Sequence, residues 1–493
     1  MTTAPALERP AAAPPRAGDA NVAQPLRAVL DRQRSSYLAD GPPTSELRID
    51  RIQRAIDLLV DHQDRICEAL DADFGHRSRE QTLLTDIMSS VDALKFARKR
   101  LGRWMRRERR SVMFPLGLFG ARAWIDYQPL GVVGVISPWN FPINLTFAPL
   151  AGILAAGNRV MIKPSEHTPA TSELMRELVA SAYDETEIAV LPGGPEVGRA
   201  FSALPFDHLL FTGATEVARH VMRAAAENLV PVTLELGGKS PVVIGRDADM
   251  ALAAKRVMTG KMMNAGQICL APDYVFVPEG RGQEFSAAAR AAAAEMYPAL
   301  ATNPDYTSVV NDRHRERLAG YLEDARRRGA EVVDVNPGNE DAGAFEPKHK
   351  MAPALVMEPS DDSQVMQQEI FGPLLPVRTY RSIDEVIDFV NARPRPLALY
   401  HFGGDSAERE TLLRRTTSGG VTLDDVVMHV AMEDLPFGGV GPSGMGRYHG
   451  REGFLTFSNQ RAVFRQARFD VGKLLRPPYG KAVRSLLRRQ ISK

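Results

Sequence analysis

The apolar and polar positions follow two different periods along the chain. From residue 45 to about residue 73 the apolar residues recur at helical spacing. After residue 130, short runs of β-branched residues bounded by Gly or Pro alternate with segments of helical spacing. A second series of the same kind begins near Val242, and strands that alternate with helices predict two parallel, doubly wound sheets of an α/β protein. The first series comprises predicted strands at 132–136, 159–163, 187–191, 208–212 and 232–236, with helices such as 173–183 and 216–227 between them.

Length and composition fit a globular protein of several domains. A chain of 493 residues exceeds what one core supports, and a composition of 44% hydrophobic and 25% charged residues can fill two or three cores. The formal net charge of +1 gives no reason to expect nucleic acid as a partner. We interpret the basic run at 98–110 as a solvated helix end that leads into a linker.

The cysteine count and the two ends of the chain suggest the compartment. Two cysteines cannot build a disulfide framework or a metal cluster, so we expect no metal and a reducing, cytoplasmic location. Residues 1–26 are rich in Ala, Pro and Arg without an apolar core, which predicts a disordered leader. The longest apolar stretch, near 147–157, is shorter than the roughly 20 residues of a membrane span, so we expect a soluble protein. Residues 467–493 carry eight basic residues and one acid, and predict a short helical tail.

Three polar side chains stand in turns marked by Gly or Pro. Cys269 ends the run Asn-Ala-Gly-Gln-Ile-Cys, Glu235 precedes two glycines, and Asn140 lies in Pro-Trp-Asn-Phe-Pro. A thiol, a carboxylate and an amide are the groups that acyl chemistry through a thioester needs, because they supply the nucleophile, the base and the oxyanion donor. A single cysteine is more often a packing residue, and a carboxylate at a strand end is paired, exposed or functional.

Two segments are candidates for binding a dinucleotide. Lys163 and Glu166 follow a predicted strand, where α/β proteins bind ligands, although both could also be ordinary surface residues. Gly213-Ala214-Thr215 joins a strand to a helix whose first N–H groups could face a pyrophosphate, although a plain turn would look the same. The run Gly-Val-Gly-Pro-Ser-Gly at 439–444 contains a proline, and neither a strand before it nor a helix after it supports a dinucleotide fingerprint. We interpret it as a glycine-rich loop that lets backbones approach closely.

The three motifs together resemble the aldehyde dehydrogenase superfamily, and the resemblance runs from about residue 47 to about residue 466. It implies that Cys269 is the nucleophile, that Glu235 is the general base and that Asn140 holds the oxyanion. A further match, Glu-Ile-Phe-Gly-Pro from Glu369, implies that Glu369 contacts the nicotinamide ribose and Phe371 the nicotinamide. The expected cofactor is NAD, with NADP possible.

The resemblance also implies a domain plan and some departures from the family. We expect an NAD(P)-binding domain at 27–111 and 129–236, an oligomerisation element at 112–128 and 459–466, and a catalytic domain at 237–458. Ala214 and Ala218 replace the family's usual Ser and Gly in the pyrophosphate turn, so cofactor binding should be modestly looser.

The segments 424–429 and 435–450 resemble the class 3 branch of the family, which implies a homodimer. Segments 220–241 and 264–275 are most similar to the bacterial coniferyl aldehyde dehydrogenases, so the expected substrate is coniferaldehyde or a related aromatic aldehyde. A long-chain aliphatic aldehyde is the alternative substrate. A cysteine acyltransferase or hydrolase, and a catalytically silent protein on the same fold, remain as alternative functions.

Overall fold

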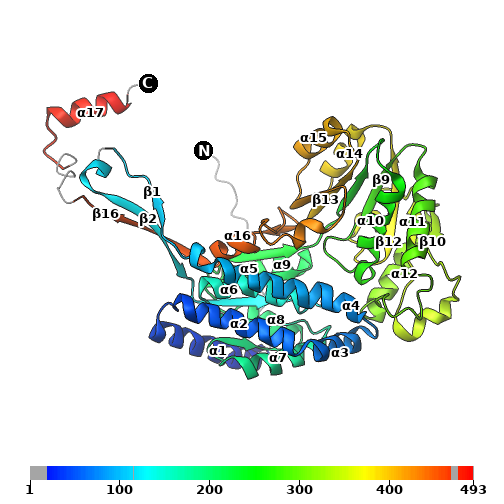
Figure 1. Cartoon of the computed structure of the whole chain (residues 1–493), viewed down its shortest axis with the longest axis horizontal. Helices are drawn as coiled ribbons and strands as arrows, with labels where there is room; N and C mark the ends of the chain where they lie inside the picture. The colour runs from blue at the N-terminus through cyan, green and yellow to red at the C-terminus, as the bar shows by residue number, and fades with distance from the viewer. Residues whose placement is uncertain (1–18, 115, 468–475, 492–493) are drawn as a thin grey trace, which may run out of the picture.

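The computed structural model describes residues 19–114, 116–467 and 476–491, and these residues form two α/β units and a narrow arm (Figure 1). The arm extends from the first unit on the side opposite the second unit (Figure 1). Each unit is built around one sheet, and the arm is a small sheet of its own. The α/β architecture with two largely parallel sheets and a small β element is therefore confirmed.

The sheet of the first unit has six strands in the order β15-β7-β6-β3-β4-β5. All its neighbours are parallel except β15, which runs antiparallel to β7. Every strand predicted between residues 132 and 236 is present, with its ends shifted by at most one residue. The strands are β3 (Val132–Ile136), β4 (Arg159–Lys163), β5 (Ile188–Val190), β6 (His208–Gly213), β7 (Val232–Leu236) and β15 (Gly444–Met445).

Helices cover this sheet, and the part of the chain before residue 75 differs from the prediction in two places. The helical segment predicted over 45–73 is two helices, because α2 ends before His62 and α3 starts after it. The predicted leader ends too late, since α1 already begins at Asp19 and buries Leu26, Val29 and Leu30 against the sheet. Those three positions share one helical face. The helices are α1 (Asp19–Asp40), α2 (Ser45–Asp61), α3 (Gln63–Phe74), α4 (Arg79–Thr82), α5 (Ser89–Trp104), α6 (Asn144–Ala156), α7 (Pro169–Ala182), α8 (Pro195–Ser202), α9 (Thr215–Ala226) and α16 (Gly450–Thr456).

The sheet of the second unit has seven strands in the order β10-β11-β12-β9-β8-β13-β14. Only the edge strand β10 is antiparallel to its neighbour. The series predicted to start near Val242 begins with β8. The strands are β8 (Pro241–Ile244), β9 (Tyr274–Pro278), β10 (Glu331–Asp334), β11 (Ala354–Met357), β12 (Leu374–Tyr380), β13 (Ala398–Phe402) and β14 (Gly420–Leu423), and the helices are α10 (Met250–Met262), α11 (Gly282–Met296), α12 (Asp312–Arg327), α13 (Gln364–Gln367), α14 (Ile383–Asn391) and α15 (Ser406–Arg415).

One boundary between the two units differs from the prediction. The predicted catalytic domain runs to residue 458, but β15 extends the first sheet and α16 packs on α6. At that packing, a Cβ on Gly152 would lie 3.0 Å from the Gly453 carbonyl carbon, so the two helices approach through glycines. The segment after residue 443 therefore returns to the first unit, which hydrophobic spacing alone does not reveal.

The arm consists of β1 (Glu108–Arg110), β2 (Arg122–Pro129) and β16 (Ser458–Arg465), all antiparallel. Strands β2 and β16 correspond to the two halves of the predicted oligomerisation element. The predicted tail contains α17 (Lys481–Ile491), which exposes Leu486, Leu487 and Ile491, while its segment 468–475 lies outside the described residues. Over the described parts of the chain, no helix is both long and apolar enough to cross a bilayer.

Buried histidines in the first unit predict loss of stability in acid. His208 on β6 is buried, with Nε2 2.9 Å from the Thr233 hydroxyl, and burial lowers its pKa to about 4. The unfolded chain then binds a proton near pH 6.5 that the folded chain refuses until about pH 4, so stability falls as pH drops through that window.

Urea denaturation between pH 4 and 7.5 measures this effect. His208→Gln should flatten the slope by about 1.4 kcal/mol per pH unit between pH 4 and pH 6.5. His220→Gln, at an exposed position on α9, is the control and should leave the slope unchanged. Equal slopes for His208→Gln and the wild type would show that the folded state tolerates a charged His208.

Candidate active site

Cys269 lies in a loop with an unusual backbone. The loop follows α10 and the turn η3 (Met263–Gly266), in which Asn264, Ala265 and Gly266 have φ values of 50°, 50° and 73°. Non-glycine residues rarely adopt this region and are often found there at functional sites. A Cβ on Gly266 would lie 2.2 Å from the Gly372 carbonyl oxygen, so only glycine permits this contact. The backbone thus sets the direction in which the Cys269 thiol leaves the loop.

The amide side chains of Gln267, which is buried, and Gln81, which is half-buried, hold this loop. The Gln267 amide donates to the carbonyls of Asn264 and Ser308, both at 2.9 Å, and its oxygen accepts from the Val310 N–H at 2.9 Å. The Asn264 N–H donates to the Gln81 side chain at 3.0 Å. Gln267 and Asn264 were not singled out from the sequence as functional residues. Their polar side chains, close in sequence to the candidate nucleophile Cys269, were the signal that could have identified them.

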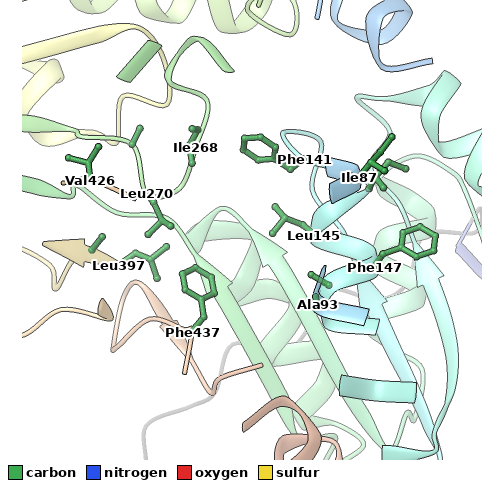
Figure 2. Close-up of a cluster of buried hydrophobic side chains, with 14 of the residues drawn as sticks. Ile87, Ala93, Phe141, Leu145, Phe147, Ile268, Leu270, Leu397, Val426 and Phe437 are labelled. Carbon is green, nitrogen blue, oxygen red and sulfur yellow. The ribbon is translucent and has the colours of Figure 1, made fainter. Parts of the chain in front are cut away.

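Asn140 lies against the nucleophile loop, although the two are far apart in sequence. It follows β3 and is buried, and its Nδ2 donates to the Gln267 carbonyl at 3.1 Å. Its own backbone carbonyl accepts from the Asn264 amide at 3.0 Å. Figure 2 shows the neighbouring residues Phe141 and Ile268, which belong to the same buried cluster where the two units meet. The amide of Asn140 is therefore held beside the loop that carries the thiol.

Glu235 is a buried carboxyl group on β7 with no ordinary partner. It is 1% exposed, and neither carboxyl oxygen has a hydrogen-bond partner of normal geometry among the described residues. Burial raises its pKa well above the usual value, against a smaller opposing effect of the Cys269 thiol. Burial also raises the pKa of Cys269, and Glu235 raises it further. The thiol and the carboxyl group are thus close enough to perturb each other's ionisation.

The glycine-rich loop at 439–444 lies beside Glu235. Gly444 is paired with Glu235 across β15 and β7. A Cβ on Gly444 would lie 2.5 Å from the Leu234 carbonyl oxygen, and one on Gly439 would lie 2.0 Å from the Ser443 carbonyl oxygen. The run therefore lets backbones approach one another, in agreement with its interpretation as a glycine-rich loop rather than a dinucleotide fingerprint.

Glu369 and Phe371 reach the same region from the second unit. The Glu369 carboxylate accepts from the Gly238 N–H at 3.1 Å, and a Cβ on Gly237 would lie 2.1 Å from it. Burial raises the pKa of Glu369 to about 7, and the charge of Asp273 adds to the effect. Phe371, with φ of 47°, packs edge-on against Trp139 at 5.3 Å between ring centroids. Phe371 therefore flanks the loop that carries Asn140, and Glu369 contacts the glycine turn that follows Glu235.

The other predicted cofactor residues lie at the carboxyl edge of the first sheet. Lys163 ends β4 and is buried, and its ammonium donates to Glu166 at 2.5 Å. Burial is the largest single effect on Glu166 and acts to raise its pKa. The hydrogen bond and the charge of Lys163, a backbone hydrogen bond and the charge of His167 together outweigh burial, and the pKa lies below the ordinary value. Gly213 ends β6, and α9 begins at Thr215 with no side chain capping its first N–H groups.

These turns surround the point where the strand order reverses. Strands β3 and β6 are neighbours, and the chain continues from β3 to β4 on one side before it returns to β6 on the other. Open α/β sheets bind ligands at the carboxyl ends of the strands at such a switch point. The donor and acceptor set fits a dinucleotide: Lys163 and Glu166 for hydroxyl groups, and the uncapped start of α9 for phosphates.

Sequence reasoning missed Tyr448 as a candidate site residue. Its side chain is buried, and burial raises the pKa of its hydroxyl, with further contributions from Glu235 and Cys269. The segment that contains it was used only to recognise a branch of the family. Among all the described residues, including those of this site, no group of three His, Cys, Asp or Glu side chains could hold a metal ion.

Comparison with known proteins gives matches over nearly the whole chain. The family model described as "Aldehyde dehydrogenase family" matches residues 2–463. A probable coniferyl aldehyde dehydrogenase of Caulobacter vibrioides is 58% identical, over 94% of this chain and 96% of its own. A coniferyl aldehyde dehydrogenase of a Pseudomonas species is 55% identical, over 94% and 96% of the two chains.

Solved structures agree with this result. The substrate-bound state of Staphylococcus aureus AldH superposes with a TM-score of 0.88 at 35% identity, over 95% of this chain and 99% of its own. An aldehyde dehydrogenase of Mycobacterium tuberculosis in complex with NAD+ gives a TM-score of 0.81 at 28% identity, over 91% and 92% of the two chains. With a family model over most of its length and relatives above half identity, the chain belongs to the aldehyde dehydrogenase family.

Proposed function

We propose that this enzyme oxidises coniferaldehyde or a related aromatic aldehyde to the acid, through a thioester on Cys269, with NAD as cofactor. The mechanism is supported by the interaction between the Glu235 carboxyl group and the Cys269 thiol, and by the bond from the Asn140 amide to the Gln267 carbonyl, two residues before Cys269. The relatives at 58% and 55% identity, whose names specify coniferyl aldehyde, support the substrate. The structure of the M. tuberculosis relative with NAD+ supports the cofactor.

In the proposed first half-reaction, Glu235 takes the proton from the Cys269 thiol. The Sγ atom then adds to the carbonyl carbon of the aldehyde, and the oxygen becomes an oxyanion. The Asn140 amide, with the N–H of Cys269, donates to that oxygen, and preorganised donors of this kind lower the barrier most. When bound, NAD supplies the hydride acceptor. Once the hydride has left, the carbon remains bonded to Sγ as a thioester.

Between the two half-reactions, Glu235 releases the thiol proton to solvent and becomes a carboxylate again. In the second half-reaction, it accepts a proton from a water molecule that attacks the thioester carbon. The carbon–sulfur bond breaks, the acid leaves, and the proton returns to sulfur. Among the described residues, neither Glu235 oxygen has a hydrogen-bond partner of normal geometry, and the closest interaction of the carboxyl group is with the Cys269 thiol. The carboxylate is therefore able to serve first the thiol and then the water.

Glu166 should set the preference between the two cofactors. Its carboxylate would accept from ribose hydroxyls and repel a 2′-phosphate, so we expect NAD to be preferred. Glu166→Gln should raise the NADP to NAD ratio of kcat/KM by roughly tenfold, which corresponds to about 1.4 kcal/mol. Steady-state kinetics with both cofactors measures it. Glu173→Gln, which removes an exposed carboxylate on α7, is the matched control. If both variants keep the wild-type ratio, Glu166 does not contact the ribose.

A substrate panel tests the proposed specificity. The panel compares coniferaldehyde with other cinnamyl, benzyl and long alkyl aldehydes, each with NAD and with NADP, and absorbance at 340 nm measures the reduced cofactor. The highest kcat/KM is expected for coniferaldehyde with NAD. A higher value for a long alkyl aldehyde would identify a fatty aldehyde dehydrogenase. Release of acid without NADH would identify a hydrolase.

We further propose that the arm formed by β1, β2 and β16 pairs with a second copy to give a homodimer. Its edges offer unpaired backbone groups, which proteins normally cover. Light scattering tests the dimer, and a tetramer would contradict it.

We assign cofactor binding to the first unit and the nucleophile to the second. A cytoplasmic location follows from the need to keep the Cys269 thiol reduced.

A further inference from the structure

A buried ion pair lies behind the loop that carries Asn140. Arg77 follows α3, and Asp86 lies in η1 (Leu83–Met88), a π-helical turn between α4 and α5. Both side chains are 0% exposed, and the Arg77 guanidinium donates to the Asp86 carboxylate at 2.6 Å. Turns of this type are rare and are often found at functional sites.

The two side chains bond to the middle and to the end of the Asn140 loop. The second guanidinium nitrogen of Arg77 donates to the Asn140 carbonyl at 2.7 Å. The other Asp86 oxygen accepts from the N–H groups of Ile143 and Asn144 at 3.2 and 3.1 Å. Asn144 begins α6, and no side chain of its own segment caps that helix. Asp86 therefore caps α6 from another element, with its negative charge at the positive end of the helix.

Two aromatic rings also lie close to the Arg77 guanidinium. Arg77 lies 4.6 Å from the centroid of the Phe74 ring and 5.1 Å from that of Phe141, the residue after Asn140. Figure 2 shows Ile87, the neighbour of Asp86, beside α6, which carries Leu145 and Phe147. The pair is thus enclosed within the packing between η1, α6 and the Asn140 loop.

The cost of burying this pair argues that it does more than stabilise the fold. Burial lowers the pKa of Arg77 and raises that of Asp86. The removal of both charges from water therefore costs free energy, which their mutual attraction must offset. The Nε of Arg77 also has no partner among the described residues. Well-packed apolar residues often stabilise such a position as well as a buried ion pair does. A planar, forked cation can, however, hold a carboxylate and a carbonyl at fixed places at once.

We propose that Arg77 and Asp86 are positioning residues that fix the Asn140 amide against the Cys269 loop. The chain of contacts runs from Asp86 to Arg77, to the Asn140 carbonyl, and through the Asn140 amide to Gln267. The inference rests on the proposed oxyanion role of Asn140.

A double-mutant cycle tests the proposal on the full-length enzyme. Arg77→Lys keeps the charge but cannot bond to Asp86 and Asn140 in the forked geometry. It should lower kcat/KM for coniferaldehyde by about 10- to 100-fold, the scale expected when a catalytic group is displaced by a fraction of an ångström to one ångström. The dissociation constant for NAD should not change. In an Asn140→Ala background the same substitution should cost less than about twofold, because coupled residues are not additive.

Controls separate positioning from stability. Arg51→Lys changes another largely buried pair, with Glu187 at 2.8 Å, and should lower the melting temperature without lowering kcat/KM. Asp86→Asn, which keeps the shape of the side chain, repeats the cycle if Arg77→Lys does not fold. A folded Arg77→Lys variant within about twofold of the wild type, or an equal loss in both backgrounds, would overturn the proposal. A wild-type rate for Asn140→Ala would instead remove the oxyanion role itself.

Discussion

Cys269→Ala is expected to abolish aldehyde oxidation. No other group in the site can form the covalent bond to the carbonyl carbon, so the residual rate should be below roughly a thousandth of the wild type. NAD binding should remain largely intact, because the residues proposed to hold NAD lie mainly in the first unit. Steady-state NADH production measures the rate, and fluorescence titration measures cofactor binding.

Cys67→Ala is the matched control for this experiment. Cys67 is the second thiol of the chain and is buried in the core on α3. Its replacement by alanine removes one sulfur from the core and should leave kcat close to that of the wild type. Substantial turnover by Cys269→Ala would show that catalysis is not covalent at Cys269, whatever the result for Cys67→Ala.

Glu235→Gln is expected to separate the two half-reactions. Glutamine keeps the shape of glutamate but cannot accept a proton, so the water that attacks the thioester loses its base. The steady-state rate should fall by about 10²–10⁴-fold, the usual scale for general-base catalysis. If the thiol can still lose its proton to solvent, rapid mixing should show a burst of NADH, up to one per active site, before the slow phase.

The pH dependence gives a second test of Glu235. The base form of Glu235 becomes more abundant as pH rises, and the wild-type steady-state rate should rise with it. Because burial raises the pKa of Glu235, this rise should occur at a higher pH than for an ordinary glutamate. The Glu235→Gln variant should lose this dependence. Glu408→Gln is the control, because burial also raises the pKa of Glu408, which lies on α15. Wild-type steady-state rates for Glu235→Gln would exclude Glu235 from the mechanism.

The sequence predicted the strands well because their patterns are local. β-branched runs bounded by Gly or Pro give five of the six strands of the first sheet, since each of these strands needs only its own residues to be recognised. The same local reading failed at His62, where two helices follow each other without Gly or Pro between them. It also failed at β15, whose two residues become a strand only through pairing with β7.

The residues proposed for catalysis can be identified in the sequence, but the residues that hold them in place cannot. Cys269, Glu235 and Asn140 stand in motifs that can be read directly from the chain. Arg77 and Asp86 stand in no such motif, and they matter because the fold brings them to Asn140 from about 60 residues away. Contacts between distant segments leave no periodic signal in the sequence, so only the structure identifies them.

The central claim is that catalysis passes through a thioester on Cys269. The most direct measurement is mass spectrometry of the Glu235→Gln variant, digested after brief incubation with NAD and coniferaldehyde. The account predicts the acyl group of the product acid on the peptide that contains Cys269, at up to one per chain, and none on the peptide that contains Cys67. NADH production without an adduct on Cys269, or an adduct elsewhere, would contradict it.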